Sequence, residues 1–108
     1  MTIDLPAPIS TYFDAKNTRD IEATLAVFAD DAKVRDEKQD HVGRPAIRAW
    51  LEAATRKYRF TATPTAIDRH DDATIVTALV AGNFPGSPVE LRYRFKMSGE
   101  RIAGLEIG

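Results

Sequence analysis

The sequence has 108 residues, of which 44% are hydrophobic and 29% are charged, and its formal net charge is -1. A chain of this length and balance forms one globular core rather than a disordered or fibrous segment. The near-neutral charge provides no long-range attraction to a phosphate backbone or an acidic membrane, which disfavours nucleic acid and membranes as partners. The absence of cysteine excludes disulfides, thiolate metal sites and a cysteine nucleophile.

The first ten residues, MTIDLPAPIS, lack a basic region followed by an apolar run, the pattern of a secretory signal. The longest apolar stretches fall far below the roughly 18 residues that a membrane-spanning helix needs. We therefore expect a cytoplasmic protein. No Ser/Gly-rich linker and no internal repeat divides the chain, so residues 1–108 are expected to form a single domain.

Two short helices are expected first. The first carries apolar residues at one-turn spacing, Ile9, Tyr12 and Phe13. The second begins after Asp20, whose carboxylate can cap it, and its apolar positions are Ile21, Leu25 and Phe28. The pair Asp30 and Asp31 is expected to end this second helix.

A short strand is expected next, at residues 32–36, where the alternation places Asp36 on the same face as Val34. A polar loop then leads to Pro45, which suits the first position of a helix. The apolar stripe of this helix is Ile47, Trp50, Leu51, Ala54 and Tyr58. The basic residues near its end, Arg56, Lys57 and Arg59, are interpreted as a solvated helix terminus rather than a nucleic-acid site.

From Phe60 onward the period changes to two, which predicts strands at about 61–69, 74–84, 89–97 and 101–107. The strand at 89–97 has the most regular alternation of apolar and charged residues. One face carries Val89, Leu91, Tyr93, Phe95 and Met97. The other face carries Glu90, Arg92, Arg94 and Lys96, which either meet solvent or form a dimer contact. This order of elements predicts an α+β fold, with helices covering one face of an antiparallel sheet.

Residues 25–36, LAVFADDAKVRD, and residues 43–48, GRPAIR, resemble the segment typical of SnoaL-like polyketide cyclases and ketosteroid isomerases. Both groups belong to the nuclear transport factor 2 (NTF2)-like superfamily, and the resemblance extends to the ending at 93–95 and 102–105. It implies the NTF2-like cone, also called cystatin-like: a curved antiparallel sheet with about three N-terminal helices covering a concave pocket. It also implies a homodimer that pairs through the sheet face.

The resemblance places individual residues as well. Asp36 falls at the position of the isomerase base, and Tyr12 at that of the tyrosine that binds the oxyanion. The third position, a protonated aspartate in the isomerases, is occupied here by Leu91, which removes half of the expected oxyanion site. The same cone also serves dehydratases, epoxide hydrolases and non-catalytic modules, so the fold alone does not determine the function.

The chemistry of the residues leaves alternatives open. On an apolar face, Asp36 would be poised to abstract a proton beside a carbonyl group, or it ends the strand by pairing with an arginine or capping a loop amide. Tyr12 either donates its hydroxyl to an oxyanion or packs in the core. The residues expected to contact substrate are Trp50, Tyr58, Leu91, Tyr93 and Asn83.

No cofactor and no metal are expected. His41, before the longest helix, is a candidate acid, and His70 a candidate metal ligand, but neither has partners at a recognisable ligand spacing. Two functions are weighed, besides a hydrolase or dehydratase, for which Asp68 and His70 are only nominal candidates. The first is a cofactor-independent isomerase or cyclase that acts on a small apolar carbonyl compound through Asp36. The second is a non-catalytic ligand-binding or dimerising module.

Overall fold

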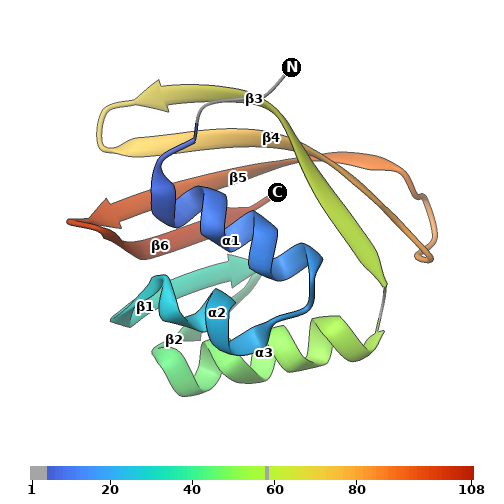
Figure 1. Cartoon of the computed structure of the whole chain (residues 1–108), viewed down its shortest axis with the longest axis horizontal. Coiled ribbons are helices and arrows are strands. Elements are labelled where there is room, and N and C mark those ends of the chain that lie inside the picture. The colour runs from blue at the N-terminus through green and yellow to red at the C-terminus, as the bar shows by residue number, and fades with distance from the viewer. Residues whose placement is uncertain (1–4, 58) are drawn as a thin grey trace.

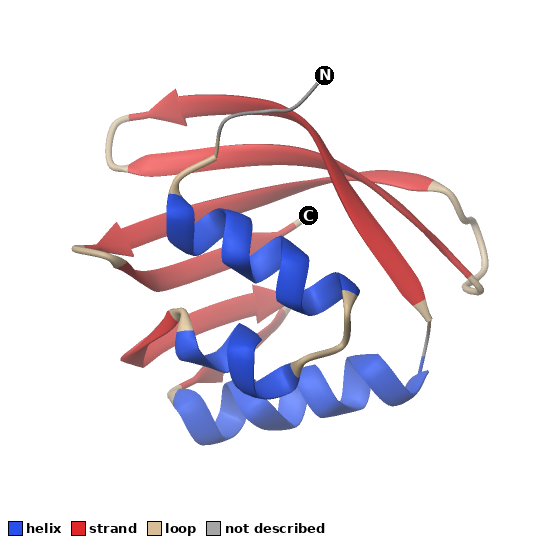
Figure 2. Cartoon of the chain, viewed as in Figure 1, coloured by secondary structure: helices blue, strands red, loops and turns tan. Residues whose placement is uncertain are grey.

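The computed structural model describes residues 5–57 and 59–108. Its elements, in chain order, are α1 (Ala7–Asn17), α2 (Ile21–Ala26), β1 (Phe28–Asp36), β2 (Gln39–Val42), α3 (Arg44–Lys57), β3 (Phe60–His70), β4 (Ala73–Gly82), β5 (Val89–Ser98) and β6 (Arg101–Ile107). The strands form one sheet in the order β2-β1-β6-β5-β4-β3. The sheet is curved and unclosed, and the helices lie against one side of it (Figures 1 and 2).

The expected α+β, NTF2-like architecture is confirmed, with one refinement to the sheet. Every neighbouring pair of strands is antiparallel except β1 and β6, which run parallel. Short hairpins force consecutive strands to be antiparallel, whereas β1 and β6 are far apart in the sequence and joined by no hairpin. No local pattern in the sequence therefore indicates their relative direction.

Polar side chains determine how α1 and α2 end and begin. The Asn17 side chain, in the last residue of α1, donates to the Ala62 carbonyl at 2.9 Å and accepts from the Ala62 N–H at 2.8 Å. This pair of bonds attaches the end of the helix to β3. The expected cap of α2 is confirmed, because Asp20 Oδ1 accepts from the Ala23 N–H at 3.1 Å.

The predicted end of the second helix is wrong. The helix stops at Ala26, while Phe28, Asp30 and Asp31 belong to β1. Phe28 is fully buried and pairs with Ile102 of β6. These tertiary contacts favour the strand more than the helical spacing of Phe28 from Ile21 and Leu25 favours a helix. The strand therefore begins several residues before the alternating pattern at 32–36.

A hairpin replaces the polar loop that was expected after Asp36. β1 and β2 pair antiparallel, and the two residues between them, Glu37 and Lys38, have φ angles of 53° and 65°. Positive φ at both central positions is the geometry of a tight hairpin turn, usually occupied by Asn and Gly. Asp40 on β2 reinforces the pairing, with an oxygen 3.0 Å from an Arg35 nitrogen. Asp36 therefore occupies the last position of β1, directly before the turn.

An aromatic cluster joins α1 to the sheet. The Tyr12 ring meets the rings of Phe28 and Phe95 edge-on, with centroids 6.0 and 5.5 Å apart. The Phe13 ring meets Tyr93 in the same way at 5.0 Å. All five side chains are buried, and edge-to-face ring pairs of this kind add to the free energy of burying the rings. This cluster is the centre of the hydrophobic core.

The outer face of β5 is charged, as the alternation predicts. Glu90, Arg92, Arg94 and Lys96 are exposed, while Tyr93 and Phe95 on the opposite face are buried. The homodimer through the sheet face stays a prediction. In the part of the chain that the structure describes, no helix has both the length and the apolar character needed to cross a bilayer.

One testable consequence concerns Gly82, the last residue of β4. A Cβ atom added here would lie 2.1 Å from the Arg59 carbonyl oxygen and 2.6 Å from Phe60 Cβ, so backbone would have to move. We expect Gly82→Ala to lower the free energy of unfolding by about 1–3 kcal/mol, measured by urea denaturation. Gly104→Ala is the matched control, since its nearest atoms would be 3.7 Å away. Equal stabilities of the two variants would contradict the close approach.

Candidate functional site

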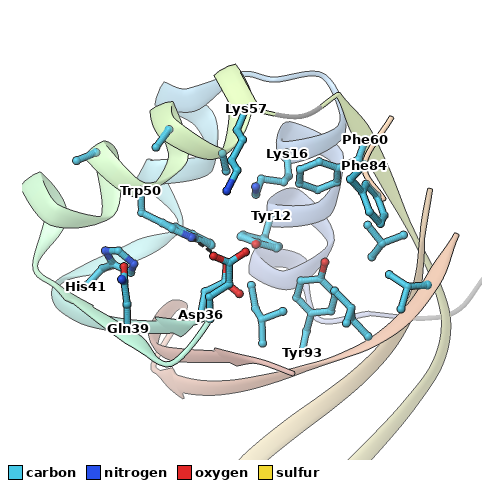
Figure 3. A pocket seen from close by; sticks show the side chains of 18 of the residues that line it. Tyr12, Lys16, Asp36, Gln39, His41, Trp50, Lys57, Phe60, Phe84 and Tyr93 are labelled. Carbon is cyan, nitrogen blue, oxygen red and sulfur yellow. Dashed lines mark hydrogen bonds between the residues drawn. The ribbon is translucent and has the colours of Figure 1, made fainter. Parts of the chain in front are cut away.

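A pocket of about 670 Å³ opens between α1, α3 and the concave side of the sheet. This volume lies within the range of small-molecule sites. Its polar lining residues include Tyr12, Lys16, Asp36, His41, Trp50 and Tyr93, and its apolar lining residues include Phe60, Val80, Phe84, Val89 and Leu91. Figure 3 shows several of these side chains around a common space, among them Lys16, Asp36 and Tyr93.

Asp36 lies on the pocket wall, half-buried, and is oriented by a hydrogen bond. Trp50 Nε1 donates to Asp36 Oδ2 at 3.1 Å. The donor reaches across because α3, which carries Trp50, packs against β1 and β2. The other carboxylate oxygen accepts no hydrogen bond from the described residues. The neighbouring Arg35 pairs with Asp40 and Glu106 instead, so Asp36 is not held in an arginine ion pair at the strand end.

Tyr12 and Tyr93 bring two hydroxyl groups to this wall. Tyr12 is fully buried, and its hydroxyl oxygen has no hydrogen-bond partner among the described residues. Burial, with smaller effects from Tyr93 and Asp36, raises the pKa of Tyr12 well above its ordinary value. Burial and the Asp36 carboxylate likewise raise the pKa of Tyr93. Both side chains therefore remain neutral hydrogen-bond donors at physiological pH, and Figure 3 shows the Tyr93 hydroxyl directed into the pocket.

The remaining predicted site residues fall into two groups. Leu91 and Trp50 line the pocket, as does Tyr93. Asn83 does not: its Oδ1 accepts from the Arg59 N–H at 2.8 Å, and the exposed side chain supports the connection to β3. Asn83 is therefore not among the residues that line this pocket. The predicted contact at Tyr58 lies outside the described residues.

The two histidines have different surroundings. His41 lines the pocket and stacks on Trp50, with ring centroids 5.9 Å apart and an angle of 29°. His70 is exposed at the end of β3, with Nε2 2.8 Å from Asp68 Oδ2, and is not part of the pocket lining. Within residues 5–57 and 59–108, no group of three or more His, Cys, Asp or Glu side chains is arranged to hold a metal ion.

Sequence reasoning missed Lys16. It lies one helical turn after Tyr12 and so shares the face of α1 that meets the pocket. Its Nζ is 5.1 Å from the Trp50 ring centroid and 4.9 Å from that of Phe60. Burial lowers the pKa of Lys16 to about 8, against a smaller opposing effect of the Asp36 carboxylate. The spacing from Tyr12 is the signal that would have identified it.

Comparison with known proteins supports the NTF2-like fold and identifies the family of the chain. The family model for the SnoaL-like domain matches residues 9–104, and the chain belongs to this family. Among curated proteins, none matches the sequence significantly.

Solved structures agree with this assignment. The chain is 43% identical to a candidate polyketide cyclase from Sinorhizobium meliloti, with a TM-score of 0.93 over 97% of this chain and 96% of that one. A protein with a ketosteroid isomerase-like fold from Catenulispora acidiphila, solved with trimethylamine, is 20% identical, with a TM-score of 0.84 over 97% of this chain and 86% of that one. A candidate polyketide cyclase from Xanthomonas campestris is 19% identical, with a TM-score of 0.81 over 94% and 86%.

The burial of Lys16 leads to a prediction about stability. Because the pKa of Lys16 is about 8 in the folded protein and ordinarily 10.5, the unfolded chain binds more protons between these values. The wild type therefore becomes more stable as the pH rises through this window, once the unfavourable burial of the charge is relieved. Lys16→Met removes the charge. Near pH 7, we therefore expect the free energy of unfolding of this variant to exceed that of the wild type by roughly 1–3 kcal/mol.

This difference should shrink as the pH approaches about 10, and urea unfolding of both proteins over a pH series measures it. Tyr12 and Tyr93 are present in both proteins, so their titration cancels from the difference. A gap between the two proteins that stays constant across the series would contradict the lowered pKa of Lys16.

Proposed function

We propose that this protein binds a small apolar carbonyl compound in its pocket and moves a proton on it, as an isomerase or cyclase does, with Asp36 as the base. The observation that carries the proposal is the Asp36 carboxylate on the pocket wall. One of its oxygens is held by Trp50, and the other accepts no hydrogen bond from the described residues. A carboxylate oriented in this way can accept a proton from a ligand carbon that lies next to it.

The proposed step is abstraction of a proton from the carbon beside the carbonyl group. The C–H bond breaks as an O–H bond forms on Asp36, and the electron pair moves to the carbonyl oxygen, which becomes an enolate. An isomerase returns the proton to a different carbon of the ligand. In a cyclase, the enolate carbon instead attacks a second carbonyl group within the ligand and forms a ring.

The tyrosines are the proposed donors to the enolate oxygen. A buried hydroxyl without a partner, such as that of Tyr12, costs free energy that a ligand oxygen can recover. Tyr93 supplies a second hydroxyl on the same wall, and the neutral Leu91 supplies none. In this proposal, Tyr93 takes the part that the resemblance assigns to an acid at position 91. The 43% identical protein from Sinorhizobium meliloti, described as a candidate polyketide cyclase, is consistent with chemistry of this class.

Exchange of α-protons for deuterium tests the base without knowledge of the natural product. The probe is 2-tetralone, an apolar ketone with acidic α-protons, followed by proton NMR in D₂O. We expect the wild type to accelerate exchange, and Asp36→Asn to lower the rate by about 10²- to 10⁴-fold, the usual contribution of a general base. Tyr93→Phe and Tyr12→Phe remove single donors and should each lower the rate by roughly 10-fold or more.

Asp31→Asn is the matched control for Asp36→Asn, because Asp31 is an exposed aspartate on the same strand. It should leave the exchange rate unchanged. Thermal unfolding of all variants shows whether each is folded. Undiminished exchange in a folded Asp36→Asn protein would remove Asp36 as the base. Saturable binding of 2-tetralone to the wild type without exchange would favour the non-catalytic binding module.

A further inference from the structure

Lys16 places a positive charge inside the aromatic part of the pocket. The side chain is half-buried, and its ammonium group lies about equally far from the Trp50 and Phe60 rings, at 5.1 and 4.9 Å. A cation over ring faces is attracted by their π electrons, which fixes its position. Figure 3 shows the Lys16 amino group directed into the space that Asp36 and Tyr12 also border.

The ring contacts leave the hydrogen-bonding capacity of Lys16 unused. An ammonium group has three N–H donors, and Lys16 Nζ makes no hydrogen bond and no ion pair with the described residues. Asp36 lies close enough to influence its pKa, yet the two groups form no ion pair within 4.0 Å. A half-buried charge with no oxygen partner is unfavourable, unless an acceptor arrives from outside the chain. The pocket beside Lys16 is the route by which such an acceptor can arrive.

We infer that the pocket takes an apolar ring compound that carries a carboxylate group, and that Lys16 binds this carboxylate. The inference rests on the proposed function only in using the same pocket as the ligand site. The Lys16 ammonium supplies charge-assisted hydrogen bonds to the ligand anion, the stronger kind of hydrogen bond in proteins. The ring skeleton then lies along the apolar lining formed by Phe60, Val80 and Leu91.

This arrangement separates the two charged ends of the site. The ligand carboxylate is held at Lys16 on α1, while Asp36 at the end of β1 faces a different part of the ligand. A carboxylate directly beside Asp36 would be repelled, so the Lys16 contact also selects the orientation of the ligand. In the proposed function, binding energy gained at Lys16 holds the carbon beside the carbonyl group near Asp36, as remote contacts do in enzymes.

A pair of ligands of nearly equal shape, one charged and one neutral, tests the inference: 2-naphthoate and 2-naphthamide. Calorimetric titration near pH 7 measures the affinity of each for the wild type and for Lys16→Met. We expect the wild type to bind the naphthoate roughly 10- to 100-fold more tightly than the amide, the range of a charge-assisted hydrogen bond. The Lys16→Met variant should lose this preference and retain its affinity for the amide.

Lys96→Met is the matched control, because Lys96 is exposed on the outer face of β5 and its replacement changes the net charge equally. It should keep the preference of the wild type. Lys16→Gln provides a second variant of similar length with the charge removed. A preference that survives both Lys16 substitutions overturns the inference. It is also overturned if the wild type binds the two ligands equally or binds neither.

The pH dependence of binding provides an independent readout. Naphthoate affinity should fall as the pH rises above about 8, because the free protein then loses the Lys16 charge. Other titratable groups also border the pocket, namely Tyr12 on α1, Asp36 and Glu37 at the end of β1, His41 on β2, Lys57 on α3 and Tyr93 on β5. Parallel titration of Lys16→Met separates their contribution. A decline of equal size in this variant would contradict the role of Lys16.

These results are independent of the proton-transfer assay. Loss of naphthoate preference in Lys16→Met supports the inference even if Asp36→Asn exchanges α-protons as fast as the wild type does. Conversely, a strong effect of Asp36→Asn on the exchange rate supports Asp36 as the base. This holds even if the wild type and the Lys16 variants bind naphthoate and naphthamide with the same affinities. Failure of one idea is therefore distinguishable from failure of the other.

Discussion

The packing of α1 against the concave side of the sheet is the contact on which the rest of the molecule depends. Tyr12 and Phe13 insert between rings contributed by β1 and β5, and the cluster is almost entirely removed from solvent. The same helix face continues one turn further to Lys16, which has passed the closed core and reaches the pocket. Core and site are therefore adjoining parts of one interface, so the docking of the helix also positions the side chains of the site.

The connection between core and site explains the unusual state of Tyr12. The Tyr12 ring packs against other aromatic rings in the core. Its hydroxyl lies at the boundary with the pocket and has no hydrogen-bond partner among the described residues. Buried polar groups of this kind are rare in folded proteins, because the lost hydrogen bond to water is not replaced. A purely structural position would be better served by phenylalanine. In the proposed function, this hydroxyl is one of the two donors to the enolate oxygen.

Much of this arrangement could be predicted from the sequence, since the signals involved are local. Strict alternation identified β5 and its buried face, and the carboxylate of Asp20 identified the start of α2. The resemblance to SnoaL-like proteins supplied the curvature and the pocket, which periodicity alone does not reveal. It also selected Asp36 and Tyr12, which the structure brings to the same wall.

The features that escaped prediction depend on contacts between distant segments. β2 was missed because its hairpin turn uses Glu37 and Lys38, residues that rarely adopt positive φ, in place of the usual Asn and Gly. Lys16 was missed because a lysine on a short helix is ordinarily solvent-facing. Its spacing from Tyr12 indicates the shared helix face, but the Trp50 and Phe60 rings that surround it come from α3 and β3.

The position of Trp50 has a practical consequence. It is the one tryptophan in the sequence. Its Nε1 donates to the Asp36 carboxylate, its ring lies 5.1 Å from Lys16 Nζ, and it stacks with the His41 ring. All tryptophan fluorescence of the protein therefore comes from a side chain that lines the pocket. Any molecule that displaces one of these three neighbours changes the emission, which gives the unlabelled protein an intrinsic optical sensor for screening ligands.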